Sequence, residues 1–212
     1  MEWDKISSEI WALNKKVIDP IAPRYTALRK NEAVPVFIPD SERLFVASQG
    51  EDAVTLSEGE MVTLMNWGNA KITKINKTPS GGVKSVEAQL HLDNKDFKKT
   101  TKLTWIAESA KAPLLPTIAV QFDDVISKPV LTKNDDFKNY INKDSKHETE
   151  MLGDPAMAAL KKGDVIQLQR RGYFKSVHWD GRESPCILFS VPDGHTKPSP
   201  TGGAKTKVSR SC

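Results

Sequence analysis

The sequence has 212 residues, of which 38% are apolar and 27% charged, and its net charge is +4. This composition is that of a soluble protein with one large or two small domains. There is no disulfide framework, signal-peptide profile or apolar run long enough to cross a membrane, so we expect a cytoplasmic protein with no membrane partner.

The first part of the chain has a helical pattern. Apolar residues recur at three- and four-residue steps from Ile6 to Val17, and Pro20 and Pro23 then interrupt the pattern. The stretch from residue 24 to residue 30 predicts a second, short helical piece.

From Val34 onward, short apolar and β-branched runs alternate with turn residues. Residues 78–82, TPSGG, separate two such runs and predict a hairpin. Many short strands at this spacing favour barrels or sandwiches. The polar region 135–160 predicts an exposed linking segment and, near Pro155, a short helix.

The last eighteen residues, 195–212, contain four basic residues, no acidic residue and almost no apolar ones. Such a composition cannot offset the entropy of ordering, so we expect a disordered basic tail. The rest of the chain is neutral, but its charges are segregated. Residues 40–60 are acidic and residues 161–175 are basic, which could steer a polyanion to one face.

Candidate catalytic and metal-binding groups are few. The four histidines lie far apart, and no pair of histidines or cysteines has metal-ligand spacing, so no metal site is expected. His178 and Asp180 could transfer a proton, although their place next to Gly181 is more typical of a loop between two strands. No phosphate loop or nucleophile elbow is present. A binding function is therefore favoured over catalysis.

A lysine-rich stretch, residues 95–105, includes a phenylalanine and ends at a tryptophan. Ammonium groups among flat side chains are typical of surfaces that bind single-stranded RNA. We interpret Lys98, Lys99 and Lys102 as candidate phosphate contacts. Trp105, which follows strand alternation, is more readily explained as a core residue.

Residues 65–69, MNWGN, place an indole between two amides at a glycine turn. Asn66 and Trp67 are candidate RNA contacts. The alternative is that Asn66 and Asn69 only close the turn.

The strand at 163–174, GDVIQLQRRGYF, alternates between apolar and polar residues. Gln167 and Gln169 fall together on the polar face, where an amide can hydrogen-bond to the edge of a base. Arg170 and Arg171 follow at the end of the strand and are further candidate RNA contacts. An exposed strand with two chance glutamines is the alternative.

Six longer stretches resemble the C-terminal half of the eukaryotic cytosolic glutamyl-tRNA synthetases, in particular the glutamyl part of the bifunctional glutamyl-prolyl enzymes. They are WALNKKVIDPIAPRYTAL (11–28), SEGEMVTLMNWGN (57–69), NKDFKKTTKLTWIAE (94–108), ISKPVLTK (126–133), KGDVIQLQRRGYF (162–174) and VPDGHTK (191–197).

The resemblance implies a helical segment over residues 1–32, two antiparallel β-barrels that bind the tRNA anticodon over 33–194, and the tail after them. It also implies that Gln167 matches the glutamine with which the related glutaminyl enzyme contacts its anticodon. Met65 stands where that relative has an anticodon-binding arginine, so this contact is not carried over.

The implied function is recognition of tRNA-Glu on behalf of a catalytic domain of the same synthetase. The ATP-site motifs of the family do not occur in this sequence. We therefore expect no cofactor and no ligase activity from this chain alone. The alternative function is a docking module that binds components of the multi-synthetase complex and binds RNA only weakly.

Overall fold

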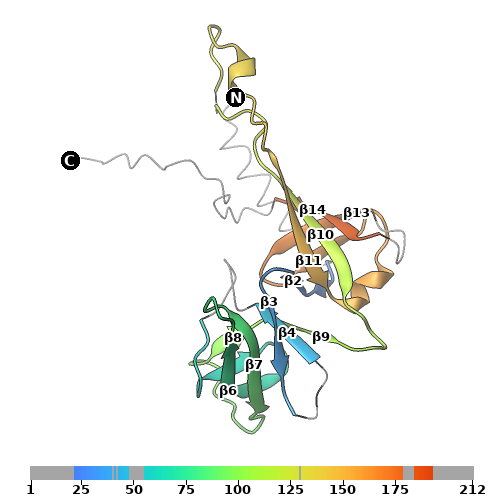
Figure 1. Cartoon of the computed structure of the whole chain (residues 1–212). Coiled ribbons are helices and arrows are strands. Elements are labelled where there is room, and N and C mark those ends of the chain that lie inside the picture. The colour runs from blue at the N-terminus through green and yellow to red at the C-terminus, as the bar shows by residue number, and fades with distance from the viewer. Residues whose placement is uncertain are drawn as a thin grey trace, which may run out of the picture.

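The computed structural model describes residues 22–39, 41, 43–47, 55–128, 130–178 and 184–192, and this part of the chain is mainly β. Its strands form two strongly curled sheets that lie one beside the other (Figure 1). The order in sheet A is β1 (Arg24–Tyr25), β12 (Val165–Leu168), β13 (Gly172–His178), β14 (Cys186–Val191), β10 (Leu115–Phe122), β11 (Lys146–Gly153) and β2 (Ala27–Arg29). The order in sheet B is β8 (Thr101–Leu103), β5 (Met61–Leu64), β6 (Gly68–Lys77), β7 (Val83–Leu90), β3 (Ala33–Phe37), β4 (Arg43–Ala47) and β9 (Trp105–Glu108).

Each sheet ends in two strands that are consecutive in the chain. The end strands of sheet A are β1 and β2, with only Thr26 between them, and those of sheet B are β8 and β9, with only Thr104 between them. One bent segment therefore completes each curled sheet. We call residues 24–29 and residues 101–108 the closing segments. Such closure removes long unpaired edges, and the prediction of two barrels is confirmed in the form of two curled, nearly closed sheets. The prediction that both barrels are antiparallel is wrong, because each sheet also contains two parallel pairs: β1 with β12 and β10 with β14 in sheet A, and β3 with β7 and β5 with β8 in sheet B.

The two sheets share one layout. In each, a hairpin pairs in parallel with the last strand of a three-stranded meander, and the closing segment connects the first meander strand to the second hairpin strand. Residues 57–71, SEGEMVTLMNWGNAK, occupy the same place in sheet B as residues 161–175, KKGDVIQLQRRGYFK, in sheet A. This repeat is too divergent to be found by inspection of the sequence, but the topology supplies the alignment.

The closing segments also join the sheets. Residues 24–29 complete sheet A although all of sheet B, residues 33–108, follows them before the next strand of sheet A begins. Leu28 and Ile106, one from each closing segment, are buried together between the sheets. Full burial of each side chain contributes about 1.5–3 kcal/mol, so the junction is held by apolar packing.

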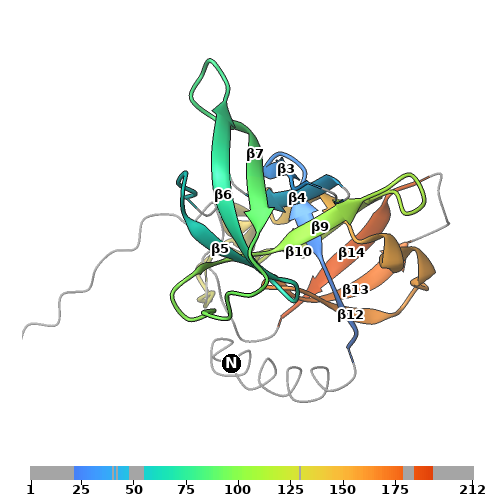
Figure 2. The same cartoon turned by 90° about the horizontal axis from the view of Figure 1, so that it is seen from below.

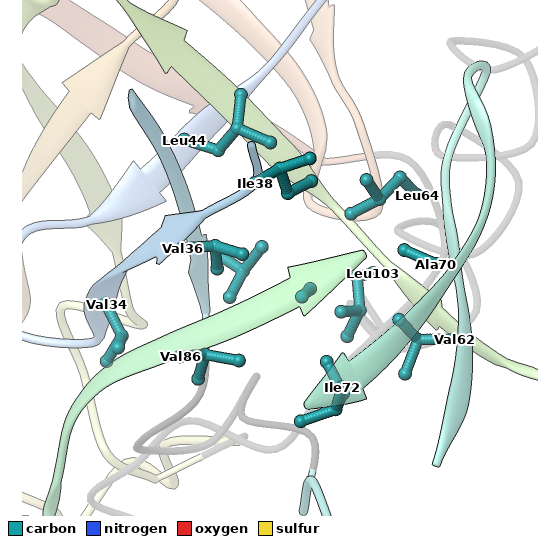
Figure 3. Close-up of a cluster of buried hydrophobic side chains, with 12 residues drawn as sticks. Val34, Val36, Ile38, Leu44, Val62, Leu64, Ala70, Ile72, Val86 and Leu103 are labelled. Carbon is teal, nitrogen blue, oxygen red and sulfur yellow. The ribbon is translucent and has the colours of Figure 1, made fainter. Parts of the chain in front are cut away.

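Each sheet encloses its own apolar core. In sheet B the buried side chains converge from opposite walls of the curl (Figure 3). They include Val36, Val46, Val86 and Leu103, as strand alternation requires. In sheet A the core includes Ile166, Leu168, Phe174 and Leu188.

Two predictions about individual segments are also wrong. The stretch predicted as a second helical piece is strand, because Ala27 and Leu28 are buried and pair with β11, and this tertiary pairing overrides helix propensity. The exposed linking segment expected from residue 135 to Pro155 is present only over residues 135–145, and the prediction is wrong for residues 146–153, which form β11 and pair with β10 from Lys146 to Gly153. The helix predicted over residues 6–17 and the tail 195–212 lie outside the described residues.

Two local predictions are confirmed. The TPSGG turn joins β6 to β7, with Gly81 at φ +88° and the Thr78 amide donating to the Gly82 carbonyl at 2.7 Å. The short helix near Pro155 is a 3-10 helix, η2 (Pro155–Ala159), and the Asp154 side chain accepts the Ala156 N–H at 2.9 Å as its N-cap.

A long arm extends from sheet A. It consists of residues 123–145 at the end of the β10–β11 hairpin, includes the 3-10 helix η1 (Phe137–Tyr140), and projects away from both sheets (Figure 1). No described residue between Gln121 and Glu150 is buried. Six of the nine large apolar side chains that are exposed in the described part of the chain lie on or beside the arm: Phe122, Val125, Val130, Leu131, Phe137 and Ile141.

Polar contacts, in place of a core, order the tip of the arm. The Asp135 carboxylate accepts hydrogen bonds from Lys128 Nζ at 2.5 Å, Thr132 N at 2.6 Å and Tyr140 Oη at 3.1 Å. These bonds, that of Lys128 first, hold the pKa of Asp135 well below its usual range, and the same contact raises the pKa of Lys128.

Candidate nucleic-acid interface

Gln167 lies on β12, at the edge that the closing segment of sheet A covers. The neighbouring Ile166 and Leu168 are fully buried and Gln167 is half-buried, so the predicted alternation is confirmed. Arg24 Nε donates to Gln167 Oε1 at 2.6 Å. Because a guanidinium can only donate, the side-chain oxygen of Gln167 must face it. The Gln167 NH₂ group has no hydrogen-bond partner in the described part of the chain, so it remains available as a donor.

Arg24 is a candidate residue that the sequence did not reveal. Strand β1 pairs in parallel with β12 and sets Arg24 directly opposite Gln167. The Arg24 side chain is exposed, so its guanidinium adds a positive charge beside the amide. The sequence hides this residue, because the pattern of residues 24–30 predicts a helix and because the two partners are 143 positions apart in the chain.

Arg170 connects the two sheets. It lies in the turn between β12 and β13, closed by the hydrogen bond from Arg171 N to Leu168 O at 3.0 Å. Its φ of +64° is a conformation in which glycine is usual, so the turn carries a local strain of about 1–3 kcal/mol. Arg170 Nη1 donates to the Lys102 carbonyl, in the closing segment of sheet B, at 3.1 Å.

Arg171 has a structural contact. Its Nε donates to the carbonyl of Ala27, in the closing segment of sheet A, at 3.2 Å, and the side chain is half-buried. Of the two arginines, Arg170 is thus the one that is exposed at the junction.

Buried amides and hydroxyls hold the loop that carries the candidate lysines. Asn69 is fully buried, and its NH₂ group donates to the carbonyls of Asn94 and Asp96, both at 3.1 Å. Thr63 donates to the Asn69 side-chain oxygen at 2.6 Å. We call residues 94–100 the lysine loop. Asn69 therefore does more than close a turn, since it fixes this loop from inside sheet B.

The three candidate lysines differ in their contacts. Lys98 and Lys99 are exposed at the outer side of the lysine loop. The Lys102 ammonium instead donates to the carbonyls of Phe97 and Thr100, the latter at 2.6 Å. Lys98 and Lys99 are therefore free to meet a phosphate, whereas Lys102 holds the loop in shape.

Asn66 and Trp67 border a shallow hollow in sheet B. Asn66 is exposed at φ +63° in the turn between β5 and β6, and the Trp67 ring lies 5.1 Å from that of Trp105, tilted by 44°. Trp105 Nε1 donates to the Met65 carbonyl at 2.8 Å, which fixes its ring. The hollow has a volume of about 470 Å³ and is lined by Ser41, Leu44, Asn66, Trp67, Trp105 and Ala107.

The structure thus connects candidates that are distant in sequence. In Figure 2, strands β12, β13 and β14 of sheet A lie on one side of the view and β5, β6 and β7 of sheet B on the other, and the contact from Arg170 to Lys102 joins the two sheets. The same contact links the Arg24–Gln167 pair to the lysine loop. The closing segment of sheet B then continues from Lys102 to Trp105, which borders the hollow. Several donors, two free lysines and exposed aromatic surface suit the phosphates and bases of a single strand.

Other candidate chemistry finds little support. No cluster of three or more metal-ligating side chains occurs among the described residues. Burial raises the pKa of the Cys186 thiol to about 11, which makes it a poor nucleophile. His178 ends β13 beside Ser184, and Asp180 lies outside the described residues. No helix in the described ranges is long and apolar enough to cross a membrane.

Comparison with known proteins gives a consistent result. The family profile described as "tRNA synthetases class I (E and Q), anti-codon binding domain" matches residues 38–93 and residues 102–176. The bifunctional glutamate/proline--tRNA ligase of Mus musculus is 51% identical over 98% of this chain and 15% of its own length. The cytoplasmic glutamate--tRNA ligase of Arabidopsis thaliana is 36% identical over 92% of this chain, and a probable one of Schizosaccharomyces pombe is 34% identical over 89%. The chain spans 30% and 29% of these two relatives.

Proposed function

Because the chain belongs to the anticodon-binding domains of the class I glutamyl- and glutaminyl-tRNA synthetases, we propose that it binds tRNA-Glu and presents it to the catalytic domain of the same synthetase. The relatives are named as glutamate ligases, which supports glutamate as the amino acid, and two of those named above are called cytoplasmic. Attachment of the amino acid would be the work of residues outside this chain, where ATP would also bind.

The observation that carries this proposal is the Arg24–Gln167 pair. With its oxygen held by Arg24, Gln167 presents its NH₂ group as a donor to the RNA. A base that carries an acceptor at that point can form a hydrogen bond with the NH₂ group. A base that carries a donor there leaves both donors without a partner. Lys98 and Lys99 add phosphate contacts that do not depend on sequence.

The test is a titration of the purified chain with tRNA-Glu and with the same tRNA changed in the anticodon, each at two salt concentrations. We expect the altered tRNA to bind about tenfold or more weakly, and both affinities to fall with salt. The variant Lys98→Ala/Lys99→Ala should weaken the binding of both tRNAs equally. Its matched control is Lys133→Ala/Lys143→Ala, which removes two exposed lysines from the arm. Equal affinity for the two tRNAs with the unaltered chain would contradict anticodon recognition.

A second function, docking to components of a multi-synthetase complex, is favoured by the arm. Its exposed apolar side chains and its balance of basic and acidic residues suit a protein partner better than RNA. The two functions are separable. Phe137→Ser, at the exposed tip, should leave tRNA binding unchanged and weaken retention of the chain by the assembled complex. If the complex retains Phe137→Ser as well as the unaltered chain, the arm does not dock to it.

A further inference from the structure

We propose that the hollow bordered by Trp67 and Trp105 is a second base-binding site, in which one unstacked base of the same RNA loop lies against the Trp67 indole and meets the Asn66 amide. This inference rests on the proposed function. The ligand is a single nucleobase. The site lies in sheet B, where the strand edge equivalent to the Arg24–Gln167 pair offers no free polar side chain.

The walls of the hollow fit a planar group. Two indole rings, Leu44 and Ala107 line it, and Asn66 and Ser41 supply its polar atoms. Trp105 is held by its bond to Met65, so one wall is rigid. Trp67 Nε1 has no hydrogen bond within the described part of the chain. The Nε1–H lies in the plane of the ring, so a base that stacks on the face of Trp67 leaves it to the solvent and can accept its hydrogen bond from Asn66.

The repeat between the sheets places the hollow beside the counterpart of the Arg24–Gln167 edge. Thr63 faces Lys102 across β5 and β8 as Gln167 faces Arg24 across β12 and β1. However, the Thr63 hydroxyl points to Asn69, and the Lys102 ammonium points to the lysine loop. At the equivalent edge of sheet B, both polar side chains are therefore used internally.

The turn between β5 and β6 differs in its side chains from the equivalent turn between β12 and β13. Asn66 and Trp67 occupy the places of Arg170 and Arg171 in the repeat, and both turns have a positive φ at the third residue. In sheet A this turn presents cationic side chains, and in sheet B it presents an indole and an amide. Sheet B is thus equipped for stacking, which tolerates any base and contributes about 1–3 kcal/mol.

The two sites lie within reach of one RNA strand. Arg170 contacts the closing segment of sheet B at Lys102, and Trp105 follows three residues later, about 10 Å along an extended chain. The lysine loop leads into the same segment and supplies Lys98 and Lys99 for the phosphates. A single-stranded loop can therefore place one base at Gln167 and another in the hollow.

The main test fills the hollow without creating a cavity. Ala107→Leu should weaken binding of the 17-nucleotide anticodon stem-loop of tRNA-Glu about tenfold, measured by fluorescence anisotropy, if stacking is lost. Ala112→Leu adds the same side chain at an exposed turn and should bind like the unaltered chain. Thermal melting of each variant checks the fold.

Abasic substitution of the RNA distinguishes stacking from general damage. With the unaltered chain, removal of the base that occupies the hollow should weaken binding about tenfold. With Ala107→Leu, the same removal should have no further effect. If every abasic stem-loop loses as much affinity with Ala107→Leu as with the unaltered chain, the hollow holds no base and the inference is wrong.

A second variant covers the case in which Ala107→Leu fails to fold. Asn66→Gly keeps the positive φ of the turn but removes the amide, so we expect it to fold and to lose about threefold to tenfold in affinity for the stem-loop. Unchanged affinity would overturn the contact. Failure of the unaltered chain to bind the stem-loop at all would overturn the proposed function with it, whereas anticodon-sensitive binding unaffected by both variants would overturn only this inference.

Discussion

Replacement of Gln167 by glutamate changes one atom at the centre of the interface. The NH₂ group becomes an oxygen, and the other oxygen, which accepts from Arg24 Nε at 2.6 Å, can remain in place. An exposed ion pair of this kind adds only about 0–1 kcal/mol, so the melting temperature should change little. Any effect on RNA binding therefore comes from the altered side chain itself and not from loss of the fold.

The size of that effect follows from the hydrogen bonds. A base edge that accepts from Gln167 would meet a carboxylate oxygen, which loses about 1–3 kcal/mol of discrimination, or a factor of about 5 to 150 in affinity. The added negative charge also repels every RNA. A tRNA with an altered anticodon measures this general repulsion, because it makes no specific contact at Gln167.

The assay is equilibrium binding of tRNA-Glu and of the altered tRNA at one salt concentration, with Gln167→Ala as a companion. We expect Gln167→Glu to weaken binding of tRNA-Glu about 5- to 150-fold more than binding of the altered tRNA, and Gln167→Ala to show the same preference without the general repulsion. Equal losses for both tRNAs in both variants would refute base reading by Gln167 and leave it a strand residue that only supports Arg24.

Three further predictions concern other parts of the molecule. Lys98→Ala/Lys99→Ala should reduce the slope of log affinity against log salt by about 1.4, at about 0.7 per phosphate, and adding Lys102→Ala should not reduce it further; a reduction near 2.1 would show that Lys102 also meets the RNA. Because the pKa of Asp135 is lowered, its contribution to the stability of the arm tip is fully present above about pH 4 and is lost only as the pH falls through the lower pKa of the folded state. The NMR resonances of Tyr140 should therefore stay native at pH 3 in the unaltered chain, whereas Asp135→Asn should shift them even at pH 7. In a Cys212→Ser background the Cys186 thiol should react with a disulfide reagent at pH 8 only as fast as the protein unfolds, and rapid native reaction would contradict its burial.

Strand alternation predicted much of the fold, because the longer strands each bury one face. The pattern around Ile166 and Leu168 gave the correct phase for Gln167, and the TPSGG turn gave its hairpin. Resemblance to a known family added the two barrels. These signals are local, or depend on long matching stretches, so they could be read directly from the chain.

The closing segments could not be predicted in the same way. Strands β1 and β2 have two and three residues, which is too short for any period to show, and the segment's Ala27 and Leu28 favour helix as readily as strand. Their conformation is decided by partners far along the chain. Arg24 was missed for that reason, and so was the contact from Arg170 to Lys102.

The arrangement of the closing segments also fixes the order in which the protein can be completed during synthesis. Sheet B needs only residues 33–108, so all of its strands have left the ribosome once Glu108 has emerged. Residues 24–29 emerge earlier than any of them, yet their partners are β11 and β12. Residues 24–29 therefore have no strand partner until more than a hundred further residues have been synthesised. The Arg24–Gln167 pair is among the last parts of the interface to form.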